Sequence, residues 1–352
     1  MDFTFTTEQL ALREAIRKFL VVEAAPELLR EIWETTRTGR SADLRAKLAD
    51  QGLTALSVPE AHGGIGLGDV DWVQVHQELG YHGIPDSLTD TAYVAVGLIN
   101  ALPGAEGFKG KWLPLIAEGK ARVAVGHPIN PLVADAEAAD LLLMWHDDEV
   151  HALAQYDITT RVNASIDLSR RLYHVDWTPS DATRICTAKV GKPLWETLTQ
   201  RASLAVAAHL LGLSQRMMDL GVDYAAQRKQ FGKPIGSQQA VKHAMADIAV
   251  KIEFAEPVVY RAAAALSRHK PDAAIHVAHA RLATGEAARL AARNSLQTHG
   301  AMGYTWEADL QMFMKRAWAL DATWGSRARQ KARIADHILA DGAALGPQHT
   351  FN

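Results

Sequence analysis

Residues 193–352 repeat apolar side chains at helical spacing, and this pattern restricts the second half of the chain to long helices. One stripe covers 204–222, a second covers 241–252 and a third covers 275–282. Each stripe lets a helix bury one face, and long helices joined by short loops pack as an antiparallel bundle. Pro257 lies beyond the second stripe, where we expect it to kink or end that helix.

Local signals place the ends of several helices. Thr6 and Gln9 have the spacing of a capping box, in which each side chain accepts a hydrogen bond from the backbone N–H of the other residue. A short helix is expected over 43–51, ended by Gly52. Gly300 is the expected end of the third long helix, because glycine readily adopts the conformation that terminates a helix.

Residues 58–69 read VPEAHGGIGLGD, a glycine-rich segment that invites comparison with a phosphate-binding loop. The glycine spacing differs from the dinucleotide-binding fingerprint, and no strand–helix unit with a following acidic residue surrounds it. We therefore interpret the segment as a tight loop between two helices, the second of which begins near Asp69.

Residues 122–192 have the pattern of a small β module. Apolar runs on either side of the polar residues 146–149 predict a hairpin. Residues 172–177 alternate as a half-buried strand does, and 181–190 is a further strand candidate. The sequence therefore predicts an α+β fold that is mostly α, with an N-terminal helical domain (1–121), a middle β domain (122–192) and a C-terminal helical bundle (193–352).

Composition excludes several classes of protein. Lys and Arg number 37 against 40 Asp and Glu, so the net charge of -3 gives no basic surface for nucleic acid. Cys186 is the single cysteine, which excludes a disulfide framework and a multi-cysteine zinc site. His276 and His279 have no carboxylate at ligand spacing, so no metal is expected. Without a spanning apolar stretch or a signal-peptide pattern, we expect a cytoplasmic protein that does not enter a membrane.

Two segments in the C-terminal half stand out. Residues 228–236 read RKQFGKPIG, and residues 297–307 read QTHGAMGYTWE. Both are expected at junctions of helix and loop, where glycines and backbone N–H groups allow a phosphate to approach closely. An arginine beside a phenylalanine suits a pyrophosphate and a stacked ring. On the residues alone, an interhelical loop with a structural arginine remains the favoured interpretation.

These two segments resemble the C-terminal signature stretches of the acyl-CoA dehydrogenase family. The segments FTTEQLALREAIRKFL, GLTALSVPEAHGGIGLG and KWLPLIAEGKARVA resemble the same family in the same order, so the resemblance spans almost the whole chain. It implies an N-terminal helical domain, a middle β domain and a C-terminal four-helix bundle. It also implies a FAD enzyme that oxidises the α,β carbons of an acyl-CoA thioester and passes electrons to a flavoprotein acceptor.

The resemblance implies a set of cofactor-binding residues. In the family, the arginine, phenylalanine and glutamine of the first segment, and the glutamine and glycine turn of the second, reach the ADP half of a FAD held by the neighbouring subunit. The corresponding positions are Arg228, Phe231, Gln239, Gln297, Gly300 and Ala301. Ala301 replaces a usual glycine, so the closest backbone approach is expected to be slightly compromised.

The catalytic base of the family has no counterpart at the expected positions. The family's glutamate is expected 27 residues after Gln297, and Trp324 stands there. Indole is only a hydrogen-bond donor and cannot accept a proton. The alternative family position on the helix before the first segment corresponds to 201–203, which also lacks a carboxylate. Glu196 and Asp321 could be proposed as displaced bases, although neither has the expected register.

The flavin-contacting stretch of the family is also absent. A T-E-P-x-x-G-S-D pattern should follow VAVGHP, but the chain has INPLVADAEAAD, and the W-I-T-N-type strand is not recognisable. We therefore expect that this subunit does not hold the isoalloxazine ring of a FAD of its own, although the half-site for a neighbour's FAD is retained.

This pattern suggests a non-catalytic subunit of a heteromeric acyl-CoA dehydrogenase, active only with its catalytic partner in an α2β2 tetramer. The acyl-CoA would be bound mainly by the partner. The sequence of residues 303–307, GYTWE, resembles that of actinobacterial enzymes that act on CoA thioesters of steroid side chains. Two alternatives stay open: a self-sufficient dehydrogenase with a displaced base, and a non-enzymatic scaffold.

Overall fold

The computed structural model describes residues 4–36, 39–343 and 345–346. Long helices make up most of the chain and the sheets are small, which confirms the predicted α+β, mostly α class, with helical N- and C-terminal parts on either side of a β middle part. In this described part of the chain, no helix combines the length and the apolar character needed to cross a membrane.

The chain forms two compact units. The helical unit contains Met1–Val22, Asp69–Gly83 and Ser203–Asn352, and the mixed unit contains Glu23–Gly68 and Ile84–Ala202. The helical unit is built from α1 (Thr7–Glu23), α4 (Asp69–Tyr81), the second half of α7 (Ala188–Gln227), α8 (Gln239–Ser267), α9 (Ala273–His299), α10 (Leu310–Asp321) and α11 (Arg327–Ile338).

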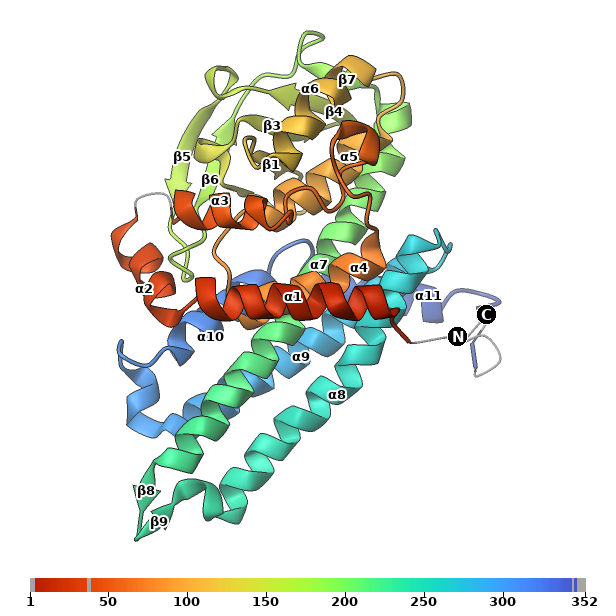
Figure 1. The fold of residues 1–352 in the computed structure, drawn as a ribbon. Helices are drawn as coiled ribbons and strands as arrows, with labels where there is room; N and C mark the ends of the chain where they lie inside the picture. The colour runs from red at the N-terminus through yellow and green to blue at the C-terminus, as the bar shows by residue number, and fades with distance from the viewer. Residues whose placement is uncertain (1–3, 37–38, 344, 347–352) are drawn as a thin grey trace. The chain divides into compact units, whose positions relative to one another are not determined.

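The long helices α7, α8 and α9 form the centre of the helical unit, with α10 and α11 packed on α9 (Figure 1). Side chains of α8 and α9 surround a glycine of α7: a β carbon at Gly221 would lie 3.1 Å from the sulfur of Met245 and 3.0 Å from Oγ of Ser295. A second close crossing joins α7 to α4, where Gly80 and Gly212 meet backbone atoms of the facing helix. Small residues let these backbones approach each other.

The end signals in the sequence are confirmed. The backbone N–H of Thr6 donates to Oε1 of Gln9 (3.0 Å) and that of Gln9 donates to Oγ1 of Thr6 (3.3 Å), which completes the capping box of α1. Gly300 follows α9 with φ 58° and ψ -136°. Of the two outcomes expected at Pro257, an end of the helix is wrong, because α8 continues for ten further residues, to Ser267, and a kink stays a prediction.

The mixed unit combines short helices with two sheets. Its helices are α2 (Pro26–Thr35), α3 (Ala42–Asp50), α5 (Val96–Ala101) and α6 (Glu106–Ala117), with the first part of α7 and a π-helical segment, Thr89–Ala95. Its strands are β1 (Val123–Gly126), β2 (Val133–Ala134), β3 (Leu141–His146), β4 (Glu149–Leu153), β5 (Thr159–Asn163), β6 (Leu172–Asp176) and β7 (Arg184–Cys186). One sheet has the order β1-β3-β4-β7 with β1 parallel to β3, and the other has the antiparallel order β2-β6-β5.

The two strongest strand signals are confirmed. β3 and β4 pair antiparallel across Asp147 and Asp148, both at positive φ, as a two-residue hairpin turn requires. In β6 the side chain of Tyr173 packs into the core of the β layers, as the alternation predicts. The strand expected over 181–190 is mostly wrong, since β7 covers only Arg184–Cys186 and α7 begins at Ala188. Residues 188–190 of that stretch belong to α7, and a helix and a strand are hard to separate by their periods in so short a window.

The glycine-rich segment 58–69 is a tight interhelical loop, as predicted. The backbone N–H groups of Gly64 and Gly66 donate to the carbonyl oxygens of Pro59 (3.1 Å) and Val58 (2.9 Å), so the loop folds back on its own start. Gly66 adopts φ 74°. The glycines are required by this turn, and the loop leads directly into α4.

Candidate functional site

A short hairpin joins α7 to α8 and carries two of the predicted cofactor-binding residues. β8 (Lys229–Gln230) pairs with β9 (Lys233–Pro234), and the turn residues Phe231 and Gly232 have φ of 51° and 78°. The backbone N–H of Ile235 donates to the carbonyl oxygen of Arg228 (2.8 Å), which fixes Arg228 at the base of the hairpin. The Phe231 side chain is 94% exposed. Figure 1 shows the hairpin at the free end of α7 and α8.

The second predicted segment begins in the last turn of α9. Gln297 is exposed on that turn, Gly300 ends the helix, and Ala301 lies in the 3-10 turn Gly300–Tyr304. The φ and ψ of Gly300 belong to a region that glycine alone adopts without strain. Space does not exclude a side chain there, so the glycine is needed for the backbone conformation. Gln239, the remaining predicted residue, is the exposed first residue of α8.

The structure brings the two segments to the same end of the helical unit. The ring of Tyr224, one turn before Arg228, stacks on the ring of His299 with centroids 4.3 Å apart and planes 21° apart. Nδ2 of Asn294 also donates to the carbonyl oxygen of Ala244 near the start of α8 (2.9 Å). All six predicted residues are exposed at this end.

The charge of this end favours an anion. Residues 224–246 contain four cations and no carboxylate, and these cations are Arg228, Lys229, Lys233 and Lys242. In the described part of the chain each of these four side chains is exposed. Exposed cations beside a glycine turn are suited to a pyrophosphate, and the face of Phe231 is suited to a planar ring. The residues present therefore fit the ADP half of a dinucleotide.

The position expected for a catalytic base holds a buried indole. Trp324 is 5% exposed and has φ 53°, in the loop between α10 and α11. One Nη of Arg281 donates to the backbone oxygens of Asp321 (3.1 Å), Thr323 (2.9 Å) and Gly325 (3.1 Å). Burial lowers the pKa of Arg281 to about 10, while the carboxylate of Asp321 opposes the shift. Arg281 therefore fixes the backbone on both sides of Trp324.

The two displaced-base candidates lie in different surroundings. Oδ2 of Asp321 accepts from Nη2 of Arg289 at 2.5 Å, and its side chain is only 17% exposed. Glu196 is exposed on the first part of α7 and belongs to the mixed unit, whereas Asp321 belongs to the helical unit. At the alternative family position, Ala202 and Ser203 are buried and carry no carboxylate.

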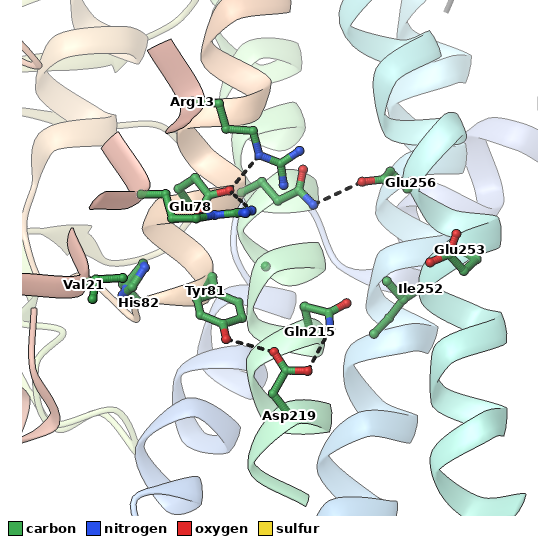
Figure 2. Close-up of a pocket in the computed structure, with 13 residues that line it drawn as sticks. Arg13, Val21, Glu78, Tyr81, His82, Gln215, Asp219, Ile252, Glu253 and Glu256 are labelled. Atoms are coloured by element: carbon green, nitrogen blue, oxygen red, sulfur yellow. Dashed lines mark hydrogen bonds and ion pairs between the residues drawn. The ribbon is translucent and has the colours of Figure 1, made fainter. Parts of the chain in front are cut away.

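A polar cavity of about 420 Å³ opens between α1, α4, α7 and α8 in the helical unit (Figure 2). Glu78 is 2% exposed and accepts from Nε of Arg13 (2.7 Å) and Nη2 of Arg17 (2.9 Å). Oη of Tyr81 donates to Asp219 (2.8 Å), and burial together with Asp219 raises the pKa of Tyr81. These groups satisfy one another and join helices, so we assign them to the fold.

Sequence reasoning missed Arg281, Glu78 and a third buried polar group, His209. His209 lies in the apolar stripe of α7, is 6% exposed, and its Nδ1 bonds the carbonyl oxygen of Ala205 (3.0 Å). In the sequence, all three share one feature that could have indicated them: each is a polar residue on the apolar face of a helix. That feature identifies burial, but it does not identify the distant partner.

Lowering the pH is expected to destabilise the helical unit through His209. Burial, and to a lesser degree the charge of Arg316, lowers the pKa of His209 from 6.5 to about 3. Below pH 6.5 the His209 ring therefore takes up a proton in the unfolded chain but stays neutral in the folded chain. The contribution of His209 to the free energy of unfolding is fully present above pH 6.5 and is lost as the pH falls towards 3. At pH 5 the loss is about 2 kcal/mol.

This pH dependence can be measured as the urea midpoint at pH 7.5 and pH 5. His209→Gln should reduce the dependence, because a neutral amide replaces the titrating ring, and the part that remains is expected from His82, whose pKa burial lowers to about 4. His243→Gln, on the exposed face of α8, is the control and should leave the slope unchanged. An equal pH slope in wild type and His209→Gln would refute the assignment.

Two family models match the chain. The model described as acyl-CoA dehydrogenase, N-terminal domain, matches residues 6–120, and the model described as acyl-CoA dehydrogenase, C-terminal domain, matches residues 194–339. The chain is 32% identical over 337 residues to acyl-CoA dehydrogenase IpdE2 of Mycolicibacterium smegmatis. The aligned region covers 94% of this chain and 99% of that relative.

Solved structures share the fold. The ChsE4-ChsE5 complex from Mycobacterium tuberculosis matches with a TM-score of 0.86 and 23% identity, over 96% of this chain and 99% of that chain. A variant of the Tcur3481-Tcur3483 steroid ACAD matches with a TM-score of 0.83 and 22% identity, over 96% and 99%. These likenesses extend along nearly the full length of the chain.

Proposed function

The chain belongs to the acyl-CoA dehydrogenase family, a family of FAD flavoproteins, and we propose that it is the non-catalytic subunit of a heteromeric enzyme. In this role it contributes the ADP half-site for a FAD whose flavin ring is held by a catalytic partner. The observation that carries the proposal is Trp324, a buried indole in the loop expected to hold the base.

A base in this family must accept a proton from the carbon next to the thioester. An indole cannot do so, because its nitrogen is only a donor. Asp321 is a poor substitute, since its carboxylate is held by Arg289 at 2.5 Å. These contacts support a chain that leaves proton abstraction to its partner.

The retained half-site has the chemistry of a diphosphate and adenosine site. We assign Arg228 to the phosphates through its planar fork, and the backbone turn at Gly300 and Ala301 to close approach of the same group. Phe231, Gln239 and Gln297 complete the set, and the exposure of all six residues suits a ligand held from outside this chain. When bound, FAD would accept the electrons of the oxidised acyl group, and a flavoprotein would receive them afterwards.

The stretch after β1 supports the absence of a second flavin site. His127, which follows β1, packs its ring 5.9 Å from that of Trp145 and 5.4 Å from that of Trp195. Trp195 is 2% exposed, and its indole nitrogen donates to the carbonyl oxygen of Glu149 (3.0 Å). Protein side chains thus occupy the space beside this turn, which in the family contacts the flavin.

The assembly follows from a half-site that needs a second chain. We propose an α2β2 tetramer with one FAD for each pair of unlike subunits. The structural relatives include a complex of two proteins, ChsE4-ChsE5, and a steroid ACAD, Tcur3481-Tcur3483. We therefore propose CoA thioesters of steroid side chains as the substrate class, bound mainly by the partner.

Flavin content tests the proposed function. The chain purified alone should be colourless, because it holds only the ADP half of a site. Co-purified with a full-length acyl-CoA dehydrogenase encoded nearby, it should yield a yellow complex with one FAD per heterodimer. Stoichiometric FAD on the lone chain, or acyl-CoA oxidation by it, would favour the self-sufficient enzyme instead.

A further inference from the structure

A groove of about 580 Å³ lies between the last turns of α7, the hairpin and the first turns of α8. Its walls are apolar apart from Ser237 and Lys242, and they include Val222, Ala225, Pro234, Val241 and Met245. At one side of the groove, Gly236 lets the loop after the hairpin lie close to α7, since a β carbon there would lie 3.1 Å from the carbonyl oxygen of Ala225. It is separate from the polar cavity beside Glu78.

The groove leaves apolar surface in contact with water. Val222, on its rim, is 44% exposed, and Phe231 at the tip of the adjoining hairpin is 94% exposed. Apolar hollows rimmed by polar residues on a folded chain commonly mark sites of protein association. The volume of the groove is sufficient for a large apolar side chain.

We propose that this groove receives an apolar side chain of the catalytic partner subunit, on a part of that subunit's surface that carries acidic groups. The inference rests on the proposed function, because the hairpin that walls the groove also carries Arg228 and Phe231 of the ADP half-site. A partner whose FAD reaches that half-site must lie against the hairpin, and the groove is the adjoining hollow.

The polarity of the groove favours a side chain over the adenine ring of the dinucleotide. A purine presents hydrogen-bonding groups along its edge, which cost free energy if buried without partners. The groove offers little to them: Oγ of Ser237 already donates to the carbonyl oxygen of Pro234 (2.7 Å) and can only accept, so the ammonium of Lys242 is the remaining side-chain donor among the lining residues. An apolar side chain needs no such partners.

The charge around the groove favours an unlike chain over a second copy of this one. The groove lies within residues 224–246 and the adjoining turn of α7, where four exposed cations outnumber the one exposed carboxylate, Asp223. Two copies joined face to face at this groove would bring those cations together, which is unfavourable. An acidic partner surface removes that repulsion.

Filling the groove tests the proposal. Ala226 lines the groove and is exposed, so Ala226→Trp adds bulk into the hollow without disturbing the core. When the variant is co-expressed with the partner, association should weaken at least about tenfold, as expected when a central anchor pocket is blocked. Light scattering after gel filtration measures the complex, and flavin absorbance is recorded on the same peak.

Two controls make the result specific. Ala332→Trp adds the same side chain on the exposed face of α11, and Ala226→Ser changes the groove without filling it. Both should retain the complex. Circular dichroism of each lone chain should match wild type, which separates loss of association from loss of folding.

The remaining outcomes overturn the groove proposal, the proposed function or both. An intact complex that loses FAD would place adenine in the groove, and an intact yellow complex would leave it without a role in assembly. If the wild-type chain forms a homodimer and Ala226→Trp dissociates it, the occupant of the groove is a second copy of this chain. If the wild-type chain binds no catalytic partner, both the groove proposal and the proposed function on which it rests are wrong. FAD on the lone chain would refute the proposed function alone, since loss of the partner in Ala226→Trp would still support the groove.

Discussion

Replacing Arg228 with alanine is expected to remove most of the FAD from the co-purified complex while the two chains stay associated. The guanidinium is the side chain of the half-site best suited to grip a diphosphate, and a hydrogen bond to a charged group contributes about 1.5–3 kcal/mol. That loss corresponds to an increase of roughly 10- to 150-fold in the dissociation constant of FAD. Flavin absorbance per heterodimer after extensive dialysis measures it.

Arg228→Lys and Arg268→Ala sharpen this test. The lysine keeps the charge but loses the planar fork, so it should restore only part of the flavin. Arg268 follows the other end of α8 and is exposed, so its loss changes the net charge equally and should leave flavin unchanged. Full flavin in Arg228→Ala would support the scaffold alternative, and a complex that dissociates would assign Arg228 to assembly.

Replacing Glu78 with alanine is expected to destabilise the helical unit by about 3 kcal/mol, because removing one partner of a buried ion pair leaves the other charge without compensation. The carboxylate is 2% exposed and accepts from Arg13 of α1 and from Arg17 one turn later. Both arginines retain some access to water, which places the effect at the lower end of the range for such pairs. The urea midpoint of the lone chain reports the change.

Glu253→Ala is the matched control for Glu78→Ala. Glu253 lines the same cavity but is exposed, and a change of less than about 0.5 kcal/mol is expected there. Glu78→Gln should fall between, since the amide keeps the shape and one acceptor oxygen but not the charge. If Glu78→Ala and Glu253→Ala unfold at the same urea concentration, the double ion pair does not anchor α1.

The features that could be predicted from the sequence are those decided by neighbours along the chain. The capping box at Thr6 and Gln9, the turn at Asp147 and Asp148, and the helix end at Gly300 each depend on a few adjacent residues. The errors arose where tertiary packing decides. At Pro257 the helix continues because its apolar face is buried on both sides of the proline, including Ile252 and Val259.

The residues of the candidate site also differ in whether they could be predicted from neighbours along the chain. The exposed residues sit in short segments that carry a recognisable pattern, so their positions could be proposed from the sequence. Arg281 could not, because the atoms it binds lie 40 to 44 residues away and are backbone oxygens, which leave no trace in residue type. Glu78 and the arginines of α1 are 61 to 65 residues apart, with the same consequence.

The carbonyl contacts of Arg281 bear on how this chain could have changed during evolution. They hold the loop through backbone atoms at Asp321, Thr323 and Gly325, and none of them involves the side chain of residue 324. The left-handed conformation of Trp324 is therefore maintained by its surroundings, whatever side chain stands there. Under the proposed function, the residue at the base position and the contacts that hold the loop thus lie at separate positions, so an ancestral gene copy could exchange one residue for another at 324 while Arg281 kept its contacts with the loop.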